Sequence, residues 1–131
     1  MKTYDIRDDA GRLLGFEISN TWLSRRQAAF IVASVPGVTI TRPVRRPFSM
    51  EPAIDEFCAF HVEDVECFLW EPFGDNSRYY IGSRAERASD QLAKIREAFN
   101  RVSPVLTLSG LLRIAYLVLL FRIVFVRLSF G

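Results

Sequence analysis

Acidic residues are absent from the last quarter of the chain, and charge of any kind is scarce there. Residues 105–130 carry only three charges, Arg113, Arg122 and Arg127, among long apolar runs. Such a segment is not stable in water unless lipid, the rest of the protein or another subunit covers it. Residues 1–103 hold 14 basic and 15 acidic side chains, so the chain's net charge of +2 originates in this tail.

Histidine and cysteine are also scarce, with one and two residues respectively. Two cysteines exclude a disulfide framework, and these few ligands do not make a zinc site, which needs four. A nearly neutral body argues against nucleic-acid binding. No catalytic motif, metal motif or phosphate loop is evident, so we favour a non-catalytic protein without a cofactor or small-molecule substrate. The first 15 residues lack the apolar run of a signal peptide, which predicts a cytoplasmic body.

The N-terminal segment, residues 3–19, has the alternation of a β-hairpin with the loop Asp9-Ala10-Gly11. Pairing Ile6 with Leu14 and Tyr4 with Phe16 would place every large apolar residue on one face and Gly11 at a left-handed position. This register is therefore the one that we expect.

A helix should follow, because Ser24 and Gln27 have the spacing of a capping box. The next residues are apolar nearly all round, which predicts a largely buried helix that ends at Val35-Pro36-Gly37. Residues 38–42 are rich in β-branched side chains and predict a strand. The proline-containing residues 43–55 predict a long loop.

Residues 56–62 and 65–71 predict a second hairpin about Glu63-Asp64. That turn pairs Val62 with Val65, His61 with Glu66 and Phe60 with Cys67. Both faces of this hairpin are fairly apolar, which is typical of central strands. One face would hold Cys58, Phe60, Val62, Val65, Cys67 and Leu69, and the other Phe57, Ala59, His61, Glu66, Phe68 and Trp70.

A last strand is predicted at residues 78–81, and a second helix from a capping box at Ser83-Arg84-Ala85-Glu86. Its apolar positions lie on one stripe: Ala85, Ala88, Leu92, Ile95, Phe99 and Val102. The order β-β-α-β-β-β-β-α predicts an α+β fold, a mostly antiparallel sheet with two packed helices. We expect residues 1–103 to form this domain and residues 104–131 to form a separate apolar helix.

The tail has three interpretations. Residues 105–125 are long enough for a transmembrane or tail-anchor helix, at the cost of a central Arg113. Alternatively, the tail packs on the body or completes a homo-oligomer. The third interpretation is that the tail is not a selected structure, because the composition changes abruptly at Pro104. Membrane or interface contacts would come from Leu111, Leu112, Tyr116, Leu119, Phe121 and Phe125.

The loop at residues 43–55 and the strand end before it carry the best binding candidates. Arg42, Arg45 and Arg46 can bind phosphate or carboxylate groups, and Phe48 can stack on a ring. The alternative is that these arginines pair with Glu51, Asp55 or Glu56. Residues 70–80 are dense in aromatic and turn-forming residues, and Trp70 and Arg78 there are typical anchors of an interaction edge.

His61 opposite Glu66 is the only pair suited to general-base chemistry, and a cross-strand contact is the plainer interpretation. Cys58 and Cys67 share a face but lie diagonally, too far apart for a disulfide. Our leading hypothesis is a non-catalytic interaction domain tethered to a membrane by the tail, with a protein partner or self-association. The alternatives are a soluble homo-oligomer completed by the tail, a small enzyme that uses His61 and Glu66, and nucleic-acid binding through the arginine loop.

Overall fold

The computed structural model describes residues 1–51, 54–72, 77–85 and 89–102. In these residues the elements follow the predicted order. They are β1 (Thr3–Arg7), β2 (Leu13–Ser19), α1 (Arg25–Ala33), β3 (Val38–Arg42), β4 (Glu56–Val62), β5 (Val65–Trp70), β6 (Arg78–Ser83) and α2 (Asp90–Arg101). The predicted α+β class is confirmed, and the predicted apolar C-terminal helix lies outside the described residues.

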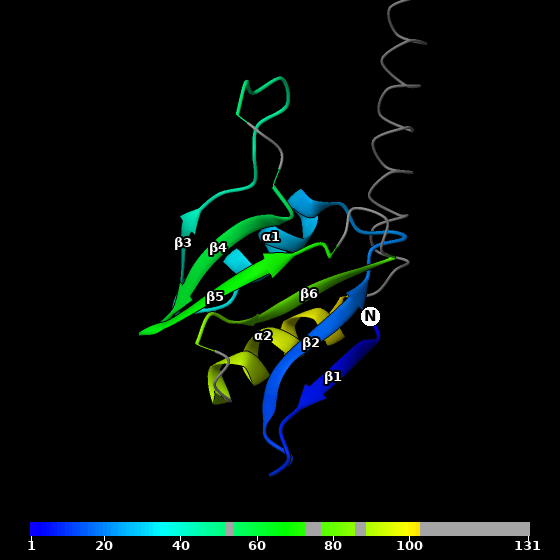
Figure 1. Ribbon diagram of the computed structural model, residues 1–131, viewed down its shortest axis with the longest axis vertical. Coiled ribbons are helices and arrows are strands. Elements are labelled where there is room, and N and C mark those ends of the chain that lie inside the picture. Colours follow the sequence, from blue (N-terminus) through cyan, green and yellow to red (C-terminus); the bar gives the residue numbers. More distant parts are fainter. Residues whose placement is uncertain (52–53, 73–76, 86–88, 103–131) are drawn as a thin grey trace, which may run out of the picture.

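The strands form one antiparallel sheet in the order β1-β2-β6-β5-β4-β3. Strands β3 to β6 follow one another as a meander, and the N-terminal hairpin joins the meander through β2 and β6. Helix α1 connects β2 near one edge to β3 at the other. Both helices lie on the same face of the sheet, so the domain has two layers (Figure 1).

One hydrophobic core lies between the sheet and the helices. Strands contribute alternate residues to it, and α2 contributes Leu92, Ile95 and Phe99, as its apolar stripe predicted. Its largest fully buried side chains are Phe16, Phe60, Phe99, Ile18, Leu69, Ile81, Leu92 and Ile95. Residues distant in sequence thus share one apolar interior, which stabilises the sheet order.

The hairpin of β4 and β5 has the predicted register. Val62 pairs with Val65, His61 with Glu66 and Phe60 with Cys67. The predicted face of Phe57 is wrong. A bulge between Glu56 and Cys58 adds one residue to β4 and so reverses the alternation of its side chains there. Phe57 is therefore buried in the core, with its ring 5.0 Å from that of Tyr79.

The predicted register of the first hairpin is wrong by one residue. Ile6 pairs with Gly15 and Tyr4 with Glu17, because the register shifts at a bulge between Ile6 and Arg7. This shift turns Asp5 toward α2, where its carboxylate accepts a hydrogen bond from Arg96 at 2.7 Å. Polar contacts with a helix distant in sequence therefore outweigh the local apolar alternation. The left-handed position of Gly11 is confirmed, with φ of 78°.

Helix α1 has the predicted capping box, in which the Ser24 hydroxyl accepts from the Gln27 amide and the Gln27 side chain accepts from the Ser24 amide. Its predicted burial is wrong, since only Ala28 and Val32 are buried and Phe30 is 76% exposed. The helix packs one stripe against the core, and among the described residues nothing covers its outer face.

Helix α2 begins later than predicted. Ser83 is the last residue of β6, pairs with Cys67 and is buried, so it cannot cap a helix. The Arg84 amide continues the strand ladder by donating to the Glu66 carbonyl at 2.9 Å. The cap is Ser89, whose side chain accepts from the Gln91 amide.

Both cysteines are free and fully buried on the core face. Burial raises the pKa of Cys58 to about 11 and that of Cys67 to about 12. Because the thiolate is the reactive form, neither thiol should react with a thiol reagent at pH 8 while the protein is folded. A colorimetric thiol assay should count no thiol in buffer and two in denaturant, and rapid labelling in buffer would contradict this packing.

Candidate functional site

The predicted binding residues fall on two surfaces of the described structure. Arg42, Arg45, Arg46 and Phe48 lie around a hollow between the loop at residues 43–55 and the start of α1. Trp70 and Arg78 lie instead on the sheet face that carries no helix. The predicted tail contacts, Leu111, Leu112, Tyr116, Leu119, Phe121 and Phe125, lie outside the described residues.

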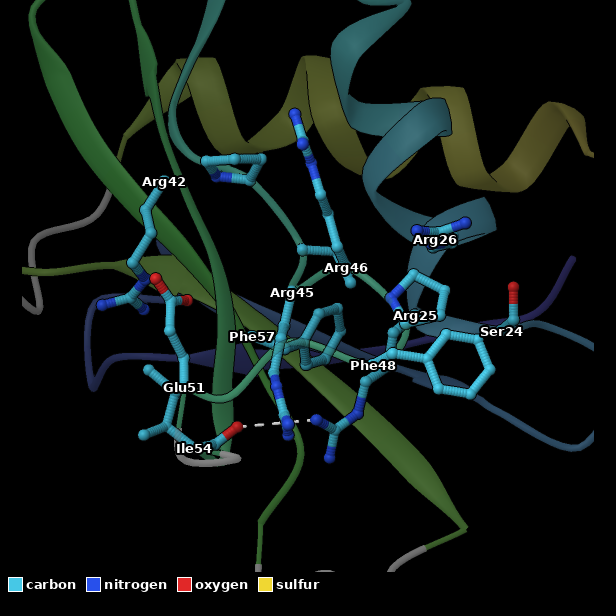
Figure 2. Close-up of a pocket in the computed structure, with 13 residues that line it drawn as sticks. Ser24, Arg25, Arg26, Arg42, Arg45, Arg46, Phe48, Glu51, Ile54 and Phe57 are labelled. Carbon is cyan, nitrogen blue, oxygen red and sulfur yellow. Dashed lines mark hydrogen bonds between the residues drawn. The ribbon is translucent and has the colours of Figure 1, made fainter.

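The hollow has a volume of about 460 Å³. Five arginines and one glutamate are among its lining residues, and Figure 2 shows their side chains around the loop and the first turn of α1. We call the residues from Ser24 to Phe30 and from Arg42 to Glu51, together with Ile54, the loop–helix surface. The full lining is Ser24, Arg25, Arg26, Arg42, Pro43, Val44, Arg45, Arg46, Pro47, Phe48, Glu51, Ile54 and Phe57.

Two of these arginines form ion pairs that stabilise the fold. Arg25 forms an ion pair with Glu71 at 2.5 Å, and its guanidinium lies 5.1 Å from the centre of the Phe57 ring. Arg42 forms an ion pair with Glu56 at 2.5 Å, as the alternative interpretation of the loop predicted. These two contacts attach the base of the loop–helix surface to the sheet.

The other three arginines have no carboxylate partner within the described part of the chain. Arg45 donates to the carbonyl of Ser49, and neither Arg26 nor Arg46 forms a hydrogen bond or ion pair there. Among the described residues, Glu51 is the one acidic side chain that lines the hollow with them. The surface therefore carries positive charge that the described residues do not neutralise, although the body as a whole is nearly neutral.

Large apolar side chains are exposed beside these charges. Phe48 and Met50 are fully exposed in the loop, and Ile54 is 48% exposed near its end. Phe48 has a φ of 63°, a left-handed conformation that costs free energy for a side chain other than glycine. The loop projects away from the sheet, so its tip stands clear of the body (Figure 1).

Sequence reasoning missed the contribution of α1 to this surface. Arg26 and Phe30 are four residues apart and share the outer face of the helix, where Phe30 is largely exposed. Trp22, just before the helix, is 68% exposed. Arg26 was the signal in the sequence, because a helix that is buried on all sides does not carry a charged arginine.

The sheet face without helices carries a separate cluster of aromatic rings and ion pairs. Arg78 bonds Glu17 at 2.8 Å and lies 3.9 Å from the centre of the Tyr4 ring. The rings of Trp70 and Tyr80 are 6.1 Å apart. The charge of Arg78 is thus matched within the face, in contrast to Arg26 and Arg46.

A carboxylate-centred network lies on the same face. Arg84 bonds Glu56 at 2.6 Å and Glu66 at 2.8 Å, while Glu56 also binds Arg42. The hydrogen bond from Arg84 lowers the pKa of Glu56 below its ordinary value. This network joins β4, β5 and the end of β6 to the base of the loop–helix surface.

The lowered pKa of Glu56 predicts a pH-dependent contribution to stability. A group whose pKa is depressed by folding stabilises the protein above its unfolded pKa, here about 4.5, and loses this effect as the pH falls through the folded pKa. Glu56→Gln should lower the free energy of unfolding by up to about 1 kcal/mol at pH 7. In urea denaturation, the difference in free energy of unfolding between Glu56→Gln and wild type should shrink below pH 4. A difference that stays constant with pH would contradict this role.

No hydrogen bond or ion pair joins the side chains of His61 and Glu66 in the described structure. The two residues pair across β4 and β5, but the Glu66 carboxylate is bound by Arg84. A separate hollow beside Glu66 is lined by Asp64–Glu66, Ser83–Ala85 and Ser89, and His61 is not among these described residues. In the described parts of the chain, no group of three His, Cys, Asp or Glu side chains is placed to hold a metal ion.

No helix within the described ranges is long and apolar enough to cross a membrane. Comparison with known proteins found no matching family model, curated protein or solved structure.

Proposed function

We propose that residues 1–103 are a non-catalytic interaction domain, held at a membrane surface by the C-terminal segment. The observation that carries the binding role is the loop–helix surface. There, exposed Phe48 and Met50 lie beside Arg26, Arg45 and Arg46, which lack carboxylate partners among the described residues. Aromatic and arginine side chains are the commonest anchors of interaction surfaces. Several large apolar side chains exposed on one loop are typical of a binding site.

The membrane role is supported by the composition of residues 105–125. This window of 21 residues holds 14 Leu, Ile, Val or Phe side chains. Each of these favours insertion by roughly 0.3–0.6 kcal/mol, which makes about 4–8 kcal/mol together. A central Arg113 opposes insertion by roughly 2.5–3.5 kcal/mol, and Arg122 lies near the end, where its side chain can extend to the interface. The balance favours a membrane helix.

Membrane fractionation of the full chain tests this tether. We expect the protein in the membrane fraction, resistant to alkaline extraction and released by detergent. The variant Leu112→Arg/Leu119→Arg adds two central charges, at roughly 2.5–3.5 kcal/mol each, which exceeds the favourable balance. It should move to the supernatant, whereas the matched variant Leu112→Ala/Leu119→Ala should stay with the membrane.

A dispersed monomer without detergent would contradict the tether. A defined oligomer in light scattering, lost in the two-arginine variant, would instead support the soluble homo-oligomer whose interface the tail completes. Either result would leave the fold of the body unchanged, but the C-terminal segment would then not be a membrane tether.

A further inference from the structure

We propose that the loop–helix surface is a second membrane contact, which recognises anionic lipid headgroups. This inference deepens the proposed function and rests on it. Phe48 and Met50 enter the interfacial region of the bilayer, and Arg26, Arg45 and Arg46 bind the lipid phosphates.

Charge complementarity is the first argument. Arginine binds phosphate through two parallel hydrogen bonds, so a lipid phosphate supplies the acceptor that these side chains lack among the described residues. Each basic residue near an anionic bilayer strengthens partition about fivefold. Three such residues give an effect large enough to measure.

The shape of the surface is the second argument. Phe48 and Met50 are 102% and 99% exposed. They belong to a loop that projects from the body (Figure 1). A stable protein interface needs about 800 Å² from each partner, with a polar rim around a buried centre. Two exposed apolar side chains on a projecting loop offer little such area, but they suit shallow insertion below the headgroups. The geometry therefore favours a lipid surface over a protein.

Tethering is the third argument. A surface of three arginines and two apolar side chains binds lipid weakly by itself, since stable anchoring takes two signals. Once the C-terminal segment holds the body at the bilayer, the loop meets lipid at a high effective concentration. The two contacts together would restrict the orientation of the body on the bilayer. The β1–β2 turn, elsewhere on the domain, would then stay in water.

Site-specific fluorescence in the full chain tests this contact. Met50→Cys offers an exposed thiol for an environment-sensitive NBD label, because Cys58 and Cys67 are fully buried. The labelled protein is added to phosphatidylcholine vesicles, with or without 30% phosphatidylserine. We expect a blue shift, and quenching by spin-labelled lipid, that is strong with phosphatidylserine and weak without it. The same label at Asp9→Cys, in the β1–β2 turn, should stay in water.

Two charge variants make the test specific. In Arg26→Gln/Arg45→Gln/Arg46→Gln, the partition of the label at position 50 into lipid with phosphatidylserine, measured from the blue shift, should fall at least tenfold. Its dependence on salt should also weaken. Arg7→Gln/Arg12→Gln/Arg101→Gln has the same net charge but leaves this surface intact, and it should behave like wild type. Equal signals in the two lipid mixtures would overturn headgroup recognition.

Vesicle flotation in the same samples separates this inference from the tether. If the protein floats with both vesicles while the label at position 50 stays in water, the inference is wrong and the tether holds. If it floats only with phosphatidylserine and the label enters lipid, the surface is confirmed and the tether is wrong. If it floats with neither vesicle, both proposals are overturned.

Discussion

Replacing Phe99 with alanine is expected to lower the free energy of unfolding by about 3–5 kcal/mol. Phe99 is fully buried in the last turn of α2, and its ring meets that of Phe16 edge to face at 5.8 Å. Removing it loses apolar burial and leaves a cavity between helix and sheet. A domain of this size has a total stability of about 5–15 kcal/mol, so the loss is a large share of it. Urea denaturation of residues 1–103 measures it.

Phe30 on α1 provides the matched control. Its ring is 76% exposed, so Phe30→Ala should change the free energy of unfolding by no more than about 0.5 kcal/mol. A cost near that of Phe99→Ala would mean that α1 is buried on all sides, which is the expectation that this structure corrects.

The second large effect is expected at Gly82, which faces Gly15 across β6 and β2. The Tyr80 side chain covers both glycines. A Cβ at Gly82 would lie 2.6 Å from Cε1 and 2.7 Å from Cζ of that ring, well inside van der Waals contact. Gly82→Ala should therefore lower the free energy of unfolding by about 1–3 kcal/mol, measured by urea denaturation.

A double-mutant cycle identifies the cause. Tyr80→Ala removes the ring that the new methyl group meets, so Gly82→Ala should cost much less in that background. Gly15→Ala should keep more of its cost there, because its Cβ would also lie 2.8 Å from the backbone carbonyl of Ile81. Full additivity of Gly82→Ala and Tyr80→Ala would show that the ring is not the obstacle.

The sequence predicted the features that local chemistry determines. A two-residue turn sets the register of β4 and β5, so the pairs from Val62–Val65 to Phe60–Cys67 follow from it. The capping box at Ser24 and the stripe of Leu92, Ile95 and Phe99 also appear as expected. These features involve residues close in sequence, where spacing carries the information.

The errors arise from contacts between distant segments. Asp5 faces Arg96 of α2, which no pattern within the first hairpin signals. Ser83 continues the ladder with β5 instead of capping a helix. The strand order depends on β2 pairing with β6, and many orders fit the same succession of elements.

The candidate site was predicted in part. The arginine loop and Phe48 were found by composition, and Arg42 was separated from the free arginines only by its contact with Glu56. Arg26, Phe30 and Met50 were not predicted. Whether these side chains are exposed depends on which parts of α1 and the loop the rest of the fold leaves uncovered.

Our proposal is that the body folds without residues 104–131 and that these residues hold it at a membrane. It is supported by the single core that the described strands and helices share. The most direct test is urea denaturation and light scattering of a chain that ends at Ser103. We expect a monomer with one cooperative transition and the costs given above for Phe99→Ala and Gly82→Ala. A chain that aggregates, or unfolds without a transition, would show that the C-terminal segment belongs to the core.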